Sequence, residues 1–331
     1  ILIPLPIILP AGTVSNGFKI IPSFGRTTSK GVSRTKSTYK DINGDGFPDI
    51  IQSNDINKIT VRLNQLGEKY DANGNATVVE PTNLLKKVTT PMGGSWEVSY
   101  ERVGNTYDMP QSKYVMKTVT INDGFTGDNA FSPDVSKVTI KYENPYHSRR
   151  ERTFYGFEKV TVNQIDTKQG GISSNVIYRK TEQTFNNKNY YLKGALLNEK
   201  LSDASGKLWT EKNHTYEFRK IDSPNTLNTL LNQERESEKN HQDYACFVAL
   251  KNTVSKFYEG TTTATKFTSM SITEYSNWGD AVKVINNGDT QIGITEAVSS
   301  EVTYGEVAPG KYVIAPKSVK NTATGVTREK R

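Results

Sequence analysis

A run of oxygen-bearing residues between positions 41 and 49 carries the clearest chemistry in the sequence. Alternate positions of this run offer an oxygen donor, from Asp41, Asn43, Asp45, the backbone carbonyl of Phe47, and Asp49. Calcium prefers roughly six to eight hard oxygen ligands, which a tight loop supplies from alternate positions. Because a glycine follows the third donor, the chain can bend sharply there. The sequence therefore predicts a calcium-binding loop made of these five residues.

The residues around this loop differ from those of an EF-hand. An EF-hand has a Glu at the twelfth position of its loop, where this sequence has Gln52, and it continues into a helix. Here Ile50 and Ile51 follow the loop, which indicates a strand. We therefore expect a calcium turn between two strands, with a structural role because every ligand closes the loop. The alternative is an Asp- and Asn-rich surface turn without metal, which these residues also favour.

The elements that position this loop are predicted to be strands throughout. Tyr, Thr, Val and Ile recur in short runs separated by Gly, Asn, Asp and Pro, a pattern typical of an all-β protein. Helices do not alternate with these runs, so a Rossmann fold, a P-loop fold and a TIM barrel are disfavoured. A turn-rich break is expected at residues 71–75. The expected strands are residues 18–21, 37–39, 49–52, 58–63, 84–89, 95–100, 114–121, 137–142, 158–163, 175–178, 246–250, 301–304 and 312–314.

Two segments depart from this pattern. Residues 223–239 begin with Ser223 as a helix N-cap and Pro224 at the first helical position, but they are polar on most sides. A helix and a solvated loop both remain open, within a polar insertion around residues 222–242. The apolar residues 1–10 contain three prolines, are too short to span a bilayer and lack a basic segment, so we expect neither a membrane span nor a signal peptide. We expect them to form an apolar edge or strand whose partner is missing, in a chain that is part of something longer.

Charge and cysteine content argue against a nucleic-acid partner, a disulfide framework and a cysteine-rich metal site. The 331 residues carry a net charge of +7, but Lys and Arg are scattered among Asp and Glu, so we expect no nucleic-acid partner. One cysteine excludes a disulfide framework and a Cys-rich metal site. The dense basic cluster is Arg149, Arg150 and Arg152. Alternation along a strand would place these side chains on two faces, where pairing with Glu151 or Glu158 is expected.

The sequence gives little support to an enzyme. The three histidines are His147, His214 and His241, and Cys246 follows the last of them by five positions. On a strand that spacing places the two side chains on opposite faces, so we expect a buried, inert cysteine. No nucleophile elbow and no zinc-protease motif is present. Asp and Glu pairs that meet only in space stay open.

Several of these segments resemble one family of bacterial toxins. The calcium loop, Asp-x-Asn-x-Asp-Gly-x-x-Asp, resembles the calcium motif of FG-GAP or VCBS repeats, which form β-propeller blades. Residues 149–160 are similar to the Arg-rich, Gly-Phe-containing segment that follows such propellers in Rhs/YD-repeat toxins and in the B component of insecticidal Tc toxins. Residues 83–100 resemble the linker of those proteins, and residues 190–194 their YY-x-x-G passage. Residues 273–284 resemble a YD repeat, in which Ser276 and Asp280 replace the usual Asp and Asn.

The resemblance implies an organisation and a role. Residues 1–80 would be an FG-GAP/VCBS-like propeller blade with the calcium loop, and residues 81–331 a β-rich segment of an Rhs-type shell built from strand-turn repeats. It implies a non-catalytic structural segment of a secreted or surface-delivered virulence toxin, part of a shell that encloses a C-terminal toxic domain. The implied partners are further propeller blades, YD repeats and the toxic domain of its own longer chain, together with other toxin-complex components.

A second interpretation is a cell-surface adhesion or carbohydrate-binding β-protein. The aromatic side chains that would stack on sugars in that case are Trp96, Trp209 and Trp278. Core packing is the commoner role of tryptophan in β-proteins.

Overall fold

The fold consists of β-strands. The computed structural model describes residues 2–4, 23–25, 36–42, 46–55, 57–66, 68–70, 73, 76–78, 84–125, 134–168, 171–227, 245–289, 297–306, 314–323 and 326–330. Every element in this part of the chain is a strand, apart from one 3-10 helix, η1 (Gly171–Ser173). The all-β prediction is confirmed. None of the described helical residues forms a segment of the length and apolarity that crossing a membrane requires.

The chain divides into two compact units, and the first comprises residues 1–40 and 48–63. In it, β1 (Leu2–Pro4) pairs antiparallel with β2 (Ser23–Gly25). The expectation that the apolar N-terminal strand lacks its partner is therefore wrong. The expected strand at residues 18–21 lies outside the described residues.

The same unit holds a small sheet with the order β3-β4-β5 among the described residues. Its strands are β3 (Ser37–Lys40), β4 (Asp49–Asp55) and β5 (Lys58–Arg62). These three strands were predicted from the sequence, and both pairings are antiparallel.

The second unit comprises residues 41–47 and 64–331. β6 (Glu68–Tyr70) pairs antiparallel with β7 (Ala76–Val78). The turn-rich break predicted at residues 71–75 lies outside the described residues, except for residue 73. The predicted boundary at residues 80 and 81 stays a prediction.

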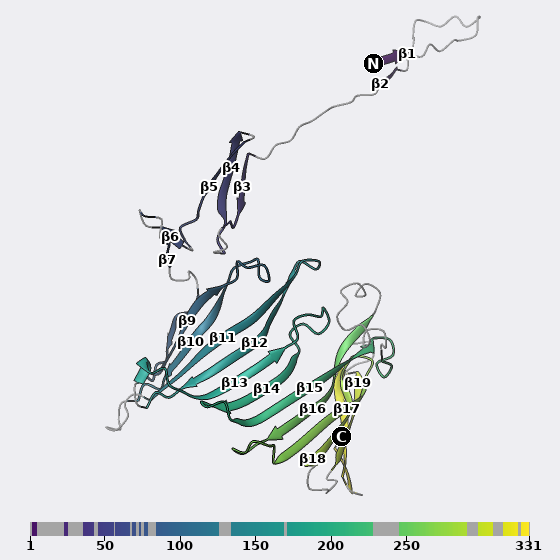
Figure 1. Cartoon of the computed structure of the whole chain (residues 1–331). Helices are drawn as coiled ribbons and strands as arrows, with labels where there is room; N and C mark the ends of the chain where they lie inside the picture. Colours follow the sequence, from purple (N-terminus) through teal and green to yellow (C-terminus); the bar gives the residue numbers. More distant parts are fainter. Residues whose placement is uncertain are drawn as a thin grey trace, which may run out of the picture. The chain divides into compact units, whose positions relative to one another are not determined.

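The rest of the second unit forms one large antiparallel sheet. In the described part of the chain it has fourteen strands, and they follow chain order from β8 to β21. Figure 1 shows that the sheet curves along this order, so that β19 stands at a steep angle to β11–β14. The strands are β8 (Lys87–Thr89), β9 (Ser95–Val103), β10 (Lys113–Asn122), β11 (Val135–Ser148), β12 (Thr153–Ile165), β13 (Ile177–Phe185), β14 (Leu196–Asp203), β15 (Leu208–Lys220), β16 (Cys246–Phe257), β17 (Lys266–Tyr275), β18 (Ala281–Asp289), β19 (Val298–Glu306), β20 (Ile314–Ala323) and β21 (Val326–Lys330).

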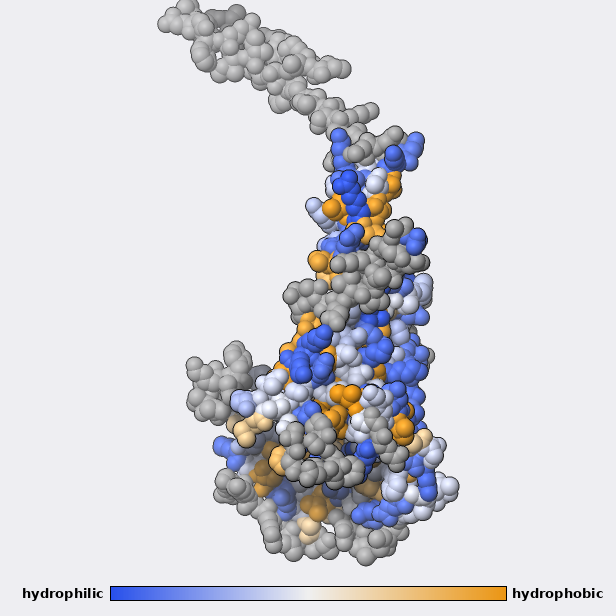
Figure 2. Space-filling view, turned by 90° about the vertical axis from the view of Figure 1, so that its left-hand side faces the viewer, coloured by the Kyte–Doolittle hydropathy of each residue, from blue (hydrophilic) through white to orange (hydrophobic). Residues whose placement is uncertain are grey.

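The two faces of this sheet differ in chemistry, as the period-2 patterns require. Directly opposed residues lie on the same face, and Val119 of β10 is opposite Val98 of β9 and Val138 of β11. The next strands continue this apolar face, with Ile140 opposite Val162. Most of these side chains are half-buried. Figure 2 shows small apolar areas between hydrophilic ones on the side of the molecule that it presents.

The opposite face carries interleaved charges. Glu182 on β13 forms ion pairs with Lys159 on β12 and with Lys180, two residues earlier on its own strand. Glu211 on β15 pairs with Lys200 on β14 at 3.7 Å and with Lys256 on β16 at 3.4 Å. Lysines and glutamates alternate across neighbouring strands on this face, so positive and negative side chains lie next to each other there.

A local core lies where the β13–β14 connection folds against the sheet. Leu192 in that connection packs with Phe218 on β15 and Cys246 on β16, and Tyr191 contacts the same cluster. The Asn189 side chain holds the turn, since its Oδ1 accepts the backbone N–H groups of Tyr191 (2.9 Å) and Leu192 (3.2 Å). The YY-x-x-G passage is thus the cover of a small hydrophobic core.

The expectation for the arginine cluster needs correction. Residues 149–152 form the turn between β11 and β12, so the arginines are not distributed over two faces of a strand. Arg149 instead stacks on Tyr107, with the guanidinium carbon 4.1 Å from the ring centroid, while Arg150 lies 3.9 Å from Glu151 as expected.

The predicted polar insertion is described only at its beginning. Thr226 donates its N–H to the carbonyl oxygen of Ser223 at 2.8 Å, and Leu227 then bridges to Arg219. This is a turn and not the first turn of a helix. Residues 228–244 lie outside the described residues.

Candidate functional site

The predicted calcium loop joins two strands, as the sequence indicates. β3 ends at Lys40 and β4 begins at Asp49, and these two residues are cross-strand partners. The backbone N–H of Gly46 donates to Asp41 Oδ2 at 2.9 Å. Gly46 has φ +86°, a left-handed conformation that glycine adopts without strain. The loop is therefore turned by its glycine and braced by its first acidic residue.

The other predicted ligands can be placed only in part. Asp49 is fully buried, and a carboxylate removed from water requires hydrogen bonds, an opposite charge or a metal ion. Asn43 and Asp45 lie outside the described residues, and Phe47 is half-buried. Among the described residues, those of the loop included, no three His, Cys, Asp or Glu residues cluster as a metal site would require. The calcium site stays a prediction.

Three of the four residues considered for catalysis are described, and they lie on three different strands, β11, β15 and β16. His214 on β15 contacts the Thr253 hydroxyl at 3.0 Å through Nδ1, and His147 lies near the end of β11. His241 lies outside the described residues. Cys246 is buried, as predicted, and burial raises the pKa of its thiol above the ordinary value, although a hydrogen bond with Tyr191 acts in the opposite direction. The thiol is therefore protonated at neutral pH, which suits packing and not nucleophilic attack.

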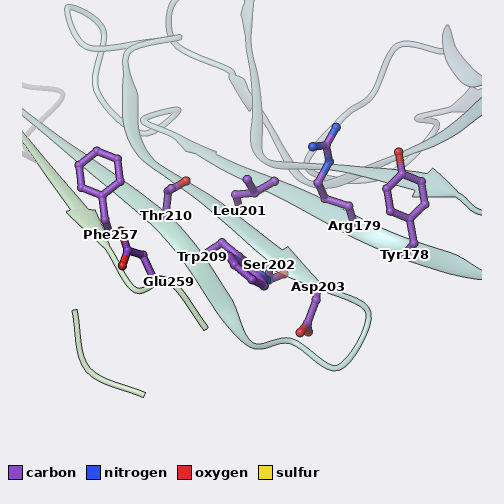
Figure 3. A pocket seen from close by; sticks show the side chains of 9 residues that line it. All are labelled: Tyr178, Arg179, Leu201, Ser202, Asp203, Trp209, Thr210, Phe257 and Glu259. Carbon is purple, nitrogen blue, oxygen red and sulfur yellow. The ribbon is translucent and has the colours of Figure 1, made fainter. Parts of the chain in front are cut away.

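A pocket opens where four neighbouring strands of the large sheet begin or end. It has a volume of about 450 Å³ and lies at the ends of β13, β14, β15 and β16. Figure 3 shows the lining side chains, which are Tyr178, Arg179, Leu201, Ser202, Asp203, Trp209, Thr210, Phe257 and Glu259. The pocket is lined by both aromatic and ionisable side chains. The sequence pattern did not indicate that these residues lie together.

All three tryptophans have exposed rings. Trp96 on β9, Trp209 on β15 and Trp278 between β17 and β18 are 37%, 46% and 60% exposed. None of the three is a buried core residue, and of the three tryptophans Trp209 lines the pocket.

A comparison with protein families places the chain in one of them. The family described as "Insecticide toxin TcdB middle/N-terminal region" matches residues 12–187, more than half of the 331 residues. The chain belongs to this family. The expected likeness to the B component of Tc toxins is confirmed, and no curated protein matches the chain.

Solved structures share the fold of this TcdB-family chain. The crystal structure of TcdB2-TccC3 without its hypervariable C-terminal region matches with a TM-score of 0.54, 12% identity and 86% of this chain covered. The crystal structure of TcdB2-TccC3 matches with a TM-score of 0.53 and 11% identity, and the match covers 88% of this chain. A Tc holotoxin pore from Photorhabdus luminescens, with a mutation in TccC3, matches with a TM-score of 0.53 and 11% identity, and the match covers 86% of this chain. The TcdB-family chain spans about a fifth of those chains, 19–20% of their length.

The YD-like segment of this TcdB-family chain forms the β17–β18 hairpin. The Ser276 and Gly279 backbones close the turn, with Gly279 N–H donating to the Ser276 carbonyl oxygen at 3.0 Å and Ser276 N–H to that of Asp280 at 2.8 Å. Gly279 has φ +87°, so the glycine supplies the bend. The Asp280 carboxylate lies 3.3 Å from the Ser276 hydroxyl, so the two residues that depart from the YD pattern contact each other.

Tyrosine hydroxyls of the large sheet form hydrogen bonds between neighbouring strands. Each of four tyrosines donates to a backbone carbonyl oxygen on or next to the preceding strand. The pairs are Tyr100 with Leu85 (2.9 Å), Tyr216 with Leu196 (3.0 Å), Tyr275 with Leu250 (2.5 Å) and Tyr304 with Ala281 (3.0 Å). The abundance of tyrosine was the only sequence signal of this arrangement.

Next to Tyr275 lies a buried ion pair. Arg219 and Glu217 on β15 contact each other and are 6% and 5% exposed. Arg219 also donates to the carbonyl oxygen of Pro224 at 3.2 Å, and Lys251 lies 3.4 Å from the second oxygen of Glu217. This group fixes the start of the 221–227 segment against the sheet.

Proposed function

We propose that the chain is a non-catalytic structural segment of a secreted or surface-delivered Tc-like toxin. Its large sheet forms part of the wall of a β-shell that encloses a C-terminal toxic domain. The partners are the remainder of its own longer chain and other components of the toxin complex. The observation that carries this proposal is the serial antiparallel sheet in a chain of the TcdB family.

The sheet has the properties that a wall needs. Strands that follow chain order grow a surface one hairpin at a time without requiring a central core. Neighbouring strands are joined by tyrosine hydroxyl hydrogen bonds and by ion pairs, in addition to the backbone hydrogen bonds of the sheet. A sheet of this kind has edges that require pairing or cover, and flanking strands of a longer chain would supply them.

We propose further that residues 1–80 end a propeller of FG-GAP type, with the calcium loop as its metal site. The proposed ligands are Asp41, Asn43, Asp45, the Phe47 carbonyl and Asp49. Calcium would stabilise the connection between β3 and β4. The glycine-turned loop and the buried Asp49 support this assignment.

Limited proteolysis of the full-length parent protein tests the enclosure. We expect the segment that follows the shell to resist protease in the intact protein and to be degraded once the shell is opened by urea. A protease that removes that segment from the intact protein at the rate seen for an exposed tail would contradict the proposal.

A further inference from the structure

Two exposed aromatic residues of the pocket at the ends of β13–β16, Tyr178 and Trp209, stand at β-bulges. On β12 and β13 the register runs from Gln164 opposite Arg179 to Ile165 opposite Ile177, which leaves Tyr178 as the extra residue. One hairpin further, Leu201 is opposite Thr210 and Ser202 is opposite Leu208, which leaves Trp209 as the extra residue. Bulges redirect side chains and occur often next to functional sites. Both exposed aromatic rings of this pocket are bulge residues.

The Trp209 side chain lies next to the turn after β16 and is partly exposed. Its backbone carbonyl oxygen accepts the N–H of Tyr258 at 2.9 Å. The tip of the indole lies 3.7 Å from where a Cβ on Gly260 would stand, so the turn after β16 approaches the ring closely. The residue is nevertheless 46% exposed. A partly exposed indole beside a turn offers a surface on which a ligand can stack.

Charged groups surround this indole in fixed positions. Asp203 Oδ1 accepts the N–H of Ser205 (2.9 Å), its hydroxyl (2.7 Å) and the N–H of Lys207 (3.0 Å). The hydrogen bond from the Ser205 hydroxyl is the main reason that the pKa of Asp203 lies below its ordinary value. Arg179 is held by a bond from Nε to Gln164 Oε1 at 2.5 Å, and a guanidinium carries four further N–H donors.

We propose that this pocket is a binding site for a neutral hexopyranose unit. One face of such a sugar is lined by C–H groups that pack on the Trp209 indole, and Tyr178 borders the pocket on the far side of β14. Its hydroxyls donate to the carboxylates of Asp203 and Glu259 and accept from Arg179. The volume of about 450 Å³ falls within the roughly 300–1,000 Å³ of small-molecule sites.

The charge of the lining favours a neutral ligand. The carboxylates of Asp203 and Glu259 are offset by the Arg179 guanidinium and by the Lys207 ammonium, whose Nζ lies 3.7 Å from the same Gly260 Cβ position as the indole tip, so a charged ligand would meet no excess of opposite charge. This site is independent of the proposed shell function, because a wall of the shell can bind a sugar on its surface or bind none.

Saturation-transfer NMR tests the site on the 331-residue chain. The probes are methyl β-D-glucopyranoside, methyl β-D-galactopyranoside, methyl α-D-mannopyranoside and N-acetylglucosamine. We expect at least one of them to receive saturation at its ring C–H protons, with a dissociation constant of about 1 mM in order of magnitude. No transfer to any of the four sugars would overturn the proposal.

Matched variants locate the binding. Trp209→Ala should weaken binding about tenfold or more, because a truncated aromatic anchor loses most of its contact energy. Trp278→Ala removes an exposed tryptophan outside the pocket and should leave binding unchanged. Tyr178→Ala, at a residue that is 51% exposed, gives a second pocket variant whose circular dichroism should match that of the parent chain. Undiminished binding in both pocket variants, or equal loss in Trp278→Ala, would contradict the assignment.

Discussion

The hydroxyl of Tyr275 on β17 donates a hydrogen bond to the backbone carbonyl oxygen of Leu250 on β16. The residue is only 6% exposed, and its ring lies edge-on to Phe247 with 5.8 Å between the ring centroids. Burial raises the pKa of the Tyr275 hydroxyl, while the charge of Arg219 lowers it and that of Glu217 raises it. The net upward shift keeps the hydroxyl protonated, so it remains a donor at any physiological pH. One side chain thus ties two strands together.

Removing this hydroxyl should destabilise the sheet. Tyr275→Phe keeps the ring but leaves the Leu250 carbonyl oxygen without this donor, so the free energy of unfolding should fall by about 1 kcal/mol. Urea unfolding followed by tyrosine and tryptophan fluorescence measures the change. Tyr107→Phe is the matched control, since Tyr107 is 76% exposed, and it should shift the midpoint little. Equal midpoints for the parent chain and Tyr275→Phe would show that the contact contributes nothing.

The buried pair of Glu217 and Arg219 should behave as a unit. Glu217→Leu leaves the guanidinium charge buried without its carboxylate, which should lower the free energy of unfolding by about 3–5 kcal/mol. The double variant Glu217→Leu/Arg219→Met removes both charges and should be more stable than the single one. Thermal unfolding of the three proteins provides the comparison. A double variant less stable than Glu217→Leu would contradict this account.

Acid should weaken the charged face of the sheet. For Glu211, burial alone would raise the pKa, but hydrogen bonds from Asn198 and Tyr258 and the nearby ammonium groups outweigh it and hold the pKa below 4.5. Glu182 is lowered in the same way, with burial opposed by Lys159 and Lys180.

A carboxylate with a lowered pKa in the folded state stabilises that state at pH values above its unfolded pKa. The contribution is lost as the pH falls from the unfolded value through the folded one. We therefore expect the melting temperature to be level near neutral pH and to fall below about pH 4.5. In Glu211→Gln this acid decline should be shallower, and a decline of the same steepness would refute the assignment.

Calcium should stabilise the chain through the loop of residues 41–49. Because a ligand that binds only the folded state raises its stability, calcium should raise the melting temperature of the parent chain relative to a chelator. Asp45→Ala should abolish that rise, whereas Asp108→Ala, at an exposed acidic residue outside the loop, should retain it. Identical melting of the parent chain with calcium and with chelator would remove the metal site.

Local patterns predicted the parts of the fold that depend on neighbouring residues. The strand-turn-strand connection from Lys40 to Asp49 follows from turn residues placed between apolar runs, and it was predicted correctly. The alternation of Trp96, Val98 and Tyr100 likewise gave β9, although Val98 alone of the three is buried.

Other features depend on contacts that the sequence does not display. β15 was not predicted because Glu211 and Lys212 stand where a half-buried strand usually alternates apolar and polar residues. Their charges are matched by residues of the neighbouring strands, Lys200 and Glu199 on β14 and Lys256 on β16. The pocket was missed for a related reason. Trp209 is exposed because of a bulge, and a bulge arises from the register of two strands and not from the order of residues in one.

The most direct test of the shell account is an electron cryomicroscopy map of the full-length parent protein. The account predicts that the sheet from β8 to β21 continues at its edges into strands of flanking sequence, as part of a wall around a hollow interior. A map in which this sheet forms a separate domain, with solvent on both faces and no enclosed space, would contradict it.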